Sequence, residues 1–215
     1  MSQTQPELVT DYAEFVDFRT QAQEDHSVEL KNRSWLCSTS VLLVAYLKTK
    51  YKCEVTSTGQ SNAKGYYDQM TQDPMWWKKE IIQMSNARSS YLPFSELPQE
   101  ETEFKTLFAK VSKLIESHTP VGGENAFKYV LSELTDNICQ HSKFKKSFMM
   151  CQAYRKKGYV ELSFIDDGIS IPGNFEEHSI GFEGDWNAIS MAVSGQSTKD
   201  NYERGRAQKF TSDIL

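Results

Sequence analysis

Apolar residues recur along the chain with two different spacings, and these spacings predict both helices and strands. The three-to-four-residue spacing of amphipathic helices predicts helices over residues 7–23, 37–50, 102–117, 124–142 and 186–193, and the start of another at residue 207. Strict alternation predicts strands over 147–154 and 159–166, joined by a hairpin at 155–158, and shorter strands over 27–30, 53–57 and 91–94. The chain is therefore predicted to have an α+β fold.

Two stretches without such periodicity separate the predicted elements. Residues 58–65 are predicted to be a loop because of their glycine, serine and asparagine content. Residues 85–101 contain two prolines and several acids, and they are the best candidate for a linker. We therefore place a small mixed α/β domain at residues 1–98 and a second domain at residues 99–215.

The composition narrows the classes of function. With 24 Lys and Arg against 29 Asp and Glu, the net charge of −5 argues against a broad nucleic-acid surface. No apolar run approaches the roughly 18 residues of a membrane span, and the N-terminus lacks the apolar core of a signal peptide. The four cysteines form no CxxC pair, which favours reduced, buried thiols over a metal site or a disulfide framework. We therefore expect a cytoplasmic protein that binds neither nucleic acid nor membrane.

A polar stripe borders the apolar face of the predicted helix 124–142. Glu133, Asn137 and His141 are spaced four apart and so lie along one line of that helix. An amide oxygen is a hard ligand for magnesium, and a carboxylate beside it can orient or deprotonate a nucleophile. Polar side chains at this spacing are also common on exposed helix faces, so the stripe alone does not establish a site.

Two further segments carry groups that suit a nucleotide. The apolar strand 159–165 runs into Asp166, Asp167 and Gly168, which places a carboxylate at the end of a strand and a glycine where a ligand can approach the backbone. By itself this would be an ordinary acidic turn. Farther along, hydroxyl and basic residues precede and flank a glycine, an arrangement that suits phosphate oxygens: Ser197, Thr198, Lys199, Arg204, Gly205 and Arg206.

In this order, the three segments resemble the GHKL family of ATP-binding domains. The family's motifs are an N-box, Glu-x-x-x-Asn, and two glycine boxes, of which the first is Asp-x-Gly-x-Gly. The matching residues are 133–137 for the N-box, 166–170 for the first glycine box, with serine in its last position, and 204–207 for a degraded second box. The resemblance covers about residues 102–215. It implies a two-layer α/β sandwich of the Bergerat type, shortened because the family's last strands are missing.

The resemblance also implies roles for the matching residues. Glu133 would activate water or an acceptor hydroxyl, and Asn137 would ligate Mg²⁺. Asp166 would hydrogen-bond the adenine amino group of ATP, and Gly168 would let the base approach. The remaining candidates for contacts with ATP are Ser170, His141, Thr198, Lys199 and Gly205, of which His141 could equally be a buried structural histidine.

The first half is similar, more weakly, to STAS domains, the partners of anti-sigma-type GHKL kinases. In residues 28–48 a strand meets a helix at a loop that bears hydroxyl groups. STAS domains are phosphorylated on such a loop, which would make Ser38, Thr39 or Ser40 the acceptor. Capping of the helix by Ser38 or Thr39 explains the same hydroxyl groups.

Two functions stay open. The first is an ATP-binding GHKL-family protein, either an ATPase or an anti-sigma-type serine/threonine kinase-like regulator, with a regulatory protein partner and compatible with a homodimer. The second is a degenerate, non-catalytic interaction module that keeps the fold and binds nucleotide weakly or not at all. Glu133, Asn137 and Asp166 favour the first function, whereas Ser170, Ala207 and the missing last strands favour the second.

Overall fold

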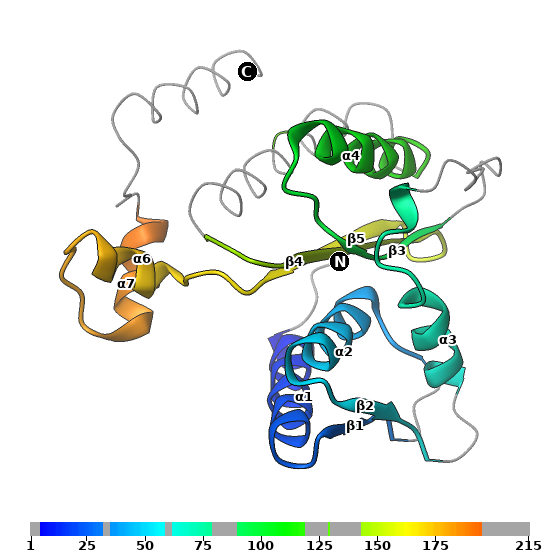
Figure 1. Ribbon diagram of the computed structural model, residues 1–215, viewed down its shortest axis with the longest axis horizontal. Coiled ribbons are helices and arrows are strands. Elements are labelled where there is room, and N and C mark those ends of the chain that lie inside the picture. The colour runs from blue at the N-terminus through cyan, green and yellow to red at the C-terminus, as the bar shows by residue number, and fades with distance from the viewer. Residues whose placement is uncertain are drawn as a thin grey trace. The chain divides into compact units, whose positions relative to one another are not determined.

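The computed structural model describes residues 5–31, 35–58, 62–78, 90–118, 129 and 143–194, and it shows an α+β protein with two sheets (Figure 1). The predicted α+β class is confirmed. The chain divides into two compact units, one from residues 1–135 and 145–166 and the other from residues 136–144 and 167–215. Each unit is described by itself.

The first unit contains most of the regular structure. Its elements are α1 (Gln5–Glu24), β1 (Ser27–Glu29), α2 (Ser38–Tyr51), β2 (Glu54–Thr56), α3 (Asn62–Met70), the short 3-10 helix η1 (Trp76–Lys78), β3 (Tyr91–Glu96), α4 (Glu101–Glu116), β4 (Ser147–Tyr154) and β5 (Tyr159–Asp166). Strands β1 and β2 form a parallel pair, whereas β3, β4 and β5 form an antiparallel sheet in that order. The predictions of α1, α2, α4, β1, β2, β4 and β5 are confirmed, to within one or two residues at their ends.

The hairpin between β4 and β5 follows from its sequence. Every residue of β4 is paired with one of β5, from Ser147 opposite Asp166 to Tyr154 opposite Tyr159. Gly158 closes the turn with a φ of 72°, a left-handed conformation that glycine adopts without strain. The turn therefore fixes the register that places Asp166 at the end of β5.

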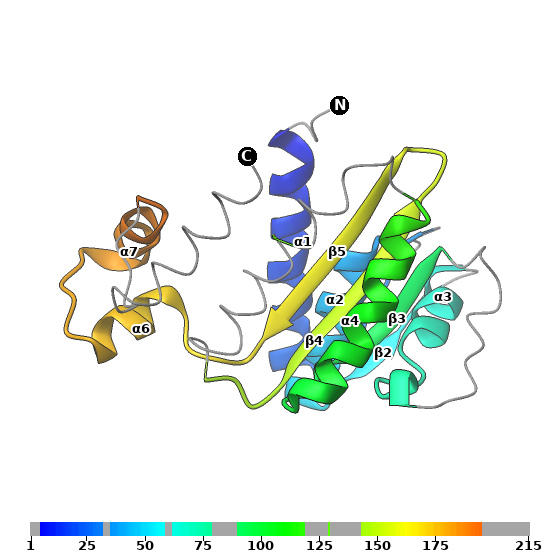
Figure 2. The ribbon, with the colours of Figure 1, turned by 90° about the horizontal axis from the view of Figure 1, so that it is seen from above.

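Helix α2 lies between the two sheets, and α4 covers the opposite face of the three-stranded sheet (Figure 1, Figure 2). This position explains why α2 is apolar around most of its circumference. Its buried residues include Val41, Leu42, Val44, Ala45 and Leu47, and the same core contains Phe94, Phe148 and Met150 of the sheet. The first unit therefore runs across the domain boundary predicted at residue 98.

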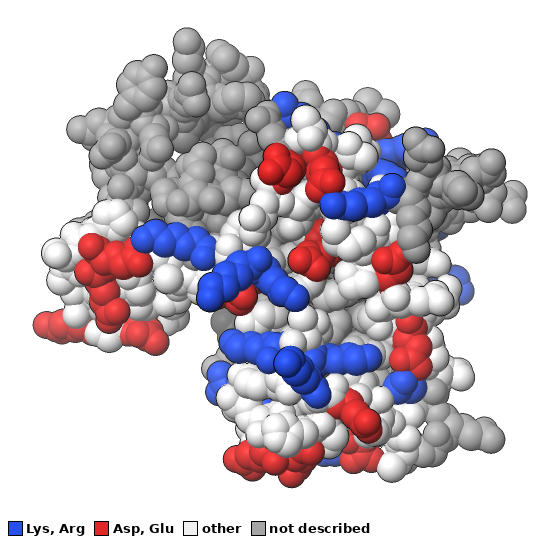
Figure 3. Space-filling model, in the orientation of Figure 1, with Lys and Arg blue, Asp and Glu red and all other residues white. Residues whose placement is uncertain are grey.

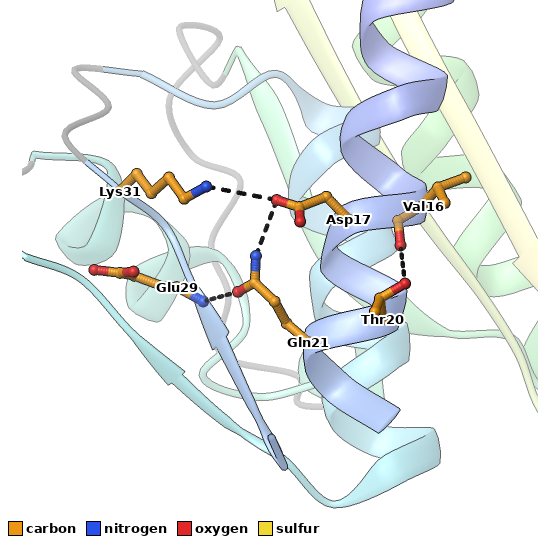
Figure 4. A network of polar contacts seen from close by, with 6 residues as sticks. All are labelled: Val16, Asp17, Thr20, Gln21, Glu29 and Lys31. Atoms are coloured by element: carbon orange, nitrogen blue, oxygen red, sulfur yellow. Dashed lines mark hydrogen bonds and ion pairs between the residues drawn. The ribbon is translucent and has the colours of Figure 1, made fainter. Parts of the chain in front are cut away.

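The side chain of Gln21 ties α1 to β1 (Figure 4). Its amide nitrogen donates to Asp17 Oδ2 at 2.9 Å, and its amide oxygen accepts the backbone N–H of Glu29 at 2.9 Å. Lys31 Nζ lies 3.7 Å from the same Asp17 oxygen, but both side chains are more than half exposed, so this ion pair contributes little. The hydrogen bonds of Gln21 thus hold the first strand against the helix.

Two segments expected to be irregular contain regular structure. The predicted loop 58–65 is wrong from residue 62, where α3 begins. Within the predicted linker 85–101, the short strand expected over 91–94 is confirmed as β3 (Tyr91–Glu96), and the linker is wrong over that strand. Pro93 fits there because β3 is an edge strand, where a missing N–H is tolerated, and the register with β4 shifts between Leu92 and Ser95.

The described part of the second unit consists of residues 143, 144 and 167–194, with α6 (Ile171–Glu177) and α7 (Gly184–Val193). Phe175 is buried and its ring lies 6.2 Å from that of Phe182 in an edge-on arrangement. Lys143 pairs with Glu177. Acidic side chains gather over the α6 and α7 region in Figure 3, where the sequence has Glu176, Glu183 and Asp185.

Candidate functional site

The structure places the predicted adenine-contacting carboxylate at the end of β5. Asp166 is the last residue of that strand, stands opposite Ser147 of β4 and is half-buried. Asp167, the next residue, is exposed, and half-buried Gly168 follows. The expected strand that ends in a carboxylate and runs into glycine is therefore present, and the role of these residues stays a prediction.

Ser170, also predicted to contact ATP, is the N-cap of α6. Its hydroxyl accepts the backbone N–H of Gly173 at 3.3 Å, and its backbone is extended, as caps require. Pro172 follows in the first turn, where a missing N–H costs nothing. The serine in place of the glycine box's second glycine therefore has a local structural use, which a glycine could not supply.

The other predicted site residues lie outside the part of the chain that the structure describes. They are Glu133, Asn137, His141, Thr198, Lys199 and Gly205. Of the predicted helix 124–142, only Tyr129 is described, and it is helical. The turn at 119–123 and the helix starting at residue 207 also lie outside the described residues. These assignments stay predictions.

The hydroxyl groups at the start of α2 form part of a polar cluster beneath the three-stranded sheet. The predicted cap by Ser38 or Thr39 is wrong, because Cys37 is the N-cap and its sulfur accepts the N–H of Ser40 at 3.4 Å. The Ser40 hydroxyl lies 3.1 Å from the same sulfur. Ser38 is fully buried, and its hydroxyl has no hydrogen-bond partner among the described residues.

Thr39 is held by Glu161 of β5. The Glu161 carboxylate accepts both the backbone N–H of Thr39, at 3.0 Å, and its hydroxyl, at 2.5 Å. The Ser163 hydroxyl lies 2.7 Å from that of Thr39 and donates to it, since the Thr39 proton is used by Glu161. A carboxylate at this position also meets the positive end of the α2 dipole. Of the three candidate phosphoacceptors, Thr39 thus has its hydroxyl bound and Ser38 has its hydroxyl enclosed.

Tyrosines extend the cluster along the same face of the sheet. The Tyr154 hydroxyl accepts the N–H of Ser38 at 3.2 Å and donates to Gln152 Oε1 at 3.3 Å. The Tyr66 hydroxyl donates to the same oxygen at 2.6 Å. Burial raises the pKa of Tyr154 most, and the negative charge of Glu161 raises it further. The phenol therefore stays protonated. The cluster thus holds one carboxylate among neutral hydroxyl groups.

Sequence reasoning missed Glu161, Gln152 and Tyr154 as partners of α2. Glu161 and Ser163 alternate with the apolar residues Val160, Leu162 and Phe164, so β5 reads as a strand with one polar face. That face is covered by α2, and a polar face under a helix needs hydrogen-bond partners. The alternation was visible in the sequence, but which helix covers the face was not.

Tyr66→Phe is expected to reduce the loss of stability at alkaline pH. Burial first, then the nearby Tyr91 and Glu161, raise the pKa of Tyr66 from 10 to about 12. The unfolded chain releases this proton near its ordinary value, so the contribution of Tyr66 to stability is complete below about pH 10 and is lost as the pH rises toward 12.

Urea unfolding of wild type and variant at about pH 8 and about pH 11 measures this difference. Tyr159→Phe, at an exposed tyrosine, is the control and should leave the pH dependence unchanged. Equal losses of stability in wild type and Tyr66→Phe would contradict the prediction.

Comparisons of this chain with protein-family models, with curated proteins and with solved structures found no match. Among the described residues, no group of three or more His, Cys, Asp or Glu side chains could hold a metal ion. No described helix is both long and apolar enough to cross a membrane. The geometry of the described residues and the sequence motifs therefore carry the functional argument.

Proposed function

We propose that this protein binds ATP with Mg²⁺ through a GHKL-type domain in its second half and acts as an ATPase or a serine/threonine kinase-like regulator. The observation that supports this most is the hairpin of β4 and β5, which ends at Asp166 and runs directly into Asp167 and Gly168. In this proposal β4 and β5, with α4 against them, are the core of a shortened Bergerat sandwich, and residues 1–98 are a STAS-like half whose β3 joins the edge of that sheet.

The described residues fit an adenine contact at the end of β5. Asp166 is half-buried at the end of the strand. At this position its carboxylate could accept hydrogen bonds from a base that approaches the backbone. Asn137 would hold the magnesium ion, and Glu133 would act on the attacking group. His141, Thr198, Lys199 and Gly205 would contact the phosphates.

Ser170 fits this proposal less well than its neighbours do. Its hydroxyl is used as the cap of α6, so we assign it no direct contact with ATP. A regulatory protein partner and a cytoplasmic location complete the proposal, and both rest on the resemblance and on the cysteine pattern alone.

A second candidate is an interaction module that keeps the fold and does not turn over nucleotide. The exposed face of α7 favours it: Trp186 is 81% exposed and Val193 is 83% exposed, and Ile189 lies between them at helical spacing. Large apolar side chains in one exposed stripe are typical of surfaces that contact other proteins.

Asp166→Asn is expected to weaken binding of Mg-ATP by about tenfold or more. The substitution replaces the charged carboxylate that would accept a hydrogen bond from the buried adenine amino group. Isothermal calorimetry on wild type, Asp166→Asn and Asn137→Ala measures the effect. Asp167→Asn is the matched control, since it removes the same charge one residue later from an exposed side chain.

Saturable binding that is weakened by Asp166→Asn and Asn137→Ala, and kept in Asp167→Asn, supports the ATP site. If wild type gives no heat at millimolar ATP, the second candidate function replaces the first. Turnover that is lost in Glu133→Ala while binding persists would assign Glu133 as the general base.

A further inference from the structure

An open concavity lies at the turn between β4 and β5, within the first unit. Its volume is about 480 Å³, inside the range of roughly 300–1,000 Å³ that is common for small-molecule sites. Trp35, Tyr154, Arg155, Lys156 and Lys157 line it. Two aromatic rings and three consecutive cations thus share one surface.

The aromatic part of this concavity is held in place. The rings of Trp35 and Tyr154 lie 5.6 Å apart in an edge-on arrangement, and the Tyr154 hydroxyl is fixed by its hydrogen bonds to Ser38 and Gln152. Trp35 nevertheless remains 48% exposed, although its neighbour Leu36 is buried. An indole that is fixed by a neighbouring ring and still open to solvent is a platform on which a planar group can stack.

Arg155 holds the cationic part in place through a hydrogen bond to His118. Arg155 Nε donates to His118 Nε2 at 2.8 Å, and His118 Nδ1 donates in turn to Leu114 O at 2.7 Å. This contact uses only the Nε of Arg155, so its two terminal amino groups can still form a bidentate contact with a phosphate. Lys157 Nζ lies 5.7 Å from the centre of the Trp35 ring.

These cations differ from the four described lysines for which an ion pair is seen. Lys31, Lys64, Lys78 and Lys143 each have an acidic partner within 4.0 Å. Arg155, Lys156 and Lys157 form no ion pair with a carboxylate of the described residues. Three adjacent cations that no described carboxylate neutralises form a local positive surface in a chain whose net charge is −5.

We propose that the concavity at the β4–β5 turn binds a nucleoside phosphate, with the base on Trp35 and the phosphate on Arg155 and Lys156. Stacking on an indole recognises the planar base, and the guanidinium and ammonium groups recognise phosphate. The same chemistry is offered by a free nucleotide and by a nucleotide of a single strand. None of the residues that line this concavity belongs to the ATP site proposed above.

Tryptophan fluorescence can report on this site directly. The chain has four tryptophans, of which Trp76 and Trp77 are buried, so Trp186→Phe leaves Trp35 as the only exposed indole. In this background, AMP and a five-nucleotide single-stranded adenylate are titrated in EDTA, which removes the Mg²⁺ that the ATP site would need. Saturable quenching by either is expected, and the tighter of the two identifies the source of the nucleotide.

Charge variants at the turn connect the quenching to the proposed contacts. Lys156→Ala and Arg155→Ala should each weaken binding by roughly fivefold to tenfold, the loss of one charge-assisted contact. Lys31→Ala is the control, at a lysine on another surface whose side chain is 67% exposed, and it should change nothing. Trp35→Leu, checked for folding by circular dichroism, should abolish the binding of radiolabelled AMP in equilibrium dialysis.

The outcomes separate this proposal from its competitors. Asp166→Asn should leave AMP quenching unchanged, and the loss of Mg-ATP binding caused by Asp166→Asn should be the same with and without Lys156→Ala, so either site can fail alone. The proposal is overturned if neither nucleotide quenches, if the affinity measured by quenching is unchanged in both Arg155→Ala and Lys156→Ala, or if inorganic phosphate or polyglutamate competes as well as AMP. The last result would indicate a site for acidic groups without a base.

Discussion

Phe148→Ala is expected to lower the free energy of unfolding by about 3–5 kcal/mol, the usual cost of emptying a large buried aromatic site. Phe148 is 2% exposed, and its ring stacks on that of Phe94 with 4.7 Å between centroids and an interplanar angle of 19°. Both rings belong to the core that also contains Val41 and Leu42 of α2. Removing the ring therefore opens a cavity where both halves of the first unit meet.

Urea denaturation followed by circular dichroism measures this loss. Phe104→Ala is the control, because Phe104 is only half-buried on α4 and stacks on Phe108, so the same substitution should cost clearly less. A loss below that of Phe104→Ala would contradict the shared core. It would instead favour a separate domain at residues 1–98, with its own unfolding transition.

Glu161→Ala is expected to cost about 2–3 kcal/mol, in line with hydrogen bonds to charged groups and with the penalty for donors left unpaired. The substitution removes the acceptor of two Thr39 donors, the N–H and the hydroxyl. It also removes the negative charge that helps to raise the pKa of Tyr154. The first turn of α2 would then lose a hydrogen bond made by a side chain from a distant strand.

A double-mutant cycle isolates this interaction. Thr39→Val keeps the shape of the side chain and removes its hydroxyl, and Glu161→Gln keeps an acceptor oxygen but removes the charge. Coupling of at least about 1 kcal/mol between Glu161→Ala and Thr39→Val is expected for groups in direct contact. Additive effects of the two substitutions would show that the hydrogen bond contributes nothing to stability.

Long periodic segments were predictable because their pattern and their environment agree. In β4 and β5 the apolar alternation, the four-residue connection and Gly158 all point to a hairpin, and the structure has it with the predicted ends. In α4 the apolar stripe is the face that packs, with Leu107, Val111 and Leu114 buried. Local signals suffice in such elements because packing reinforces the local preference.

In the misassigned elements, tertiary contacts override the local conformational preference of the residues. Gly65 and Asn62 read as loop, but Ala63, Tyr67 and Met70 bury one side of α3 in the core, and this burial outweighs the poor helix propensity. Cys37 is an unusual cap, because thiols accept hydrogen bonds weakly. In the structure it takes that place, and the hydroxyl group of the expected cap Thr39 is bound by Glu161 instead.

In the candidate site, too, the sequence predicts local features but not contacts between distant segments. Asp166 and Gly168 could be located from sequence because a strand and its end are local features. The pairing of Thr39 with Glu161 joins residues 122 positions apart, and the concavity at the β4–β5 turn brings Trp35 beside residues 153–157. Contacts of this kind depend on topology, which no spacing within one segment specifies.

The hydrogen bond between Gln21 and Glu29 also affects how the protein avoids self-association. Among the described strands, β1 pairs only with β2, through contacts such as Leu30 N–H to Thr56 O, so the Glu29 N–H faces the other side of the strand. An unpaired edge of this kind is a template for the strand of another molecule. By accepting that N–H, the Gln21 side chain occupies the position where a foreign backbone carbonyl would bind and so protects the strand against intermolecular pairing.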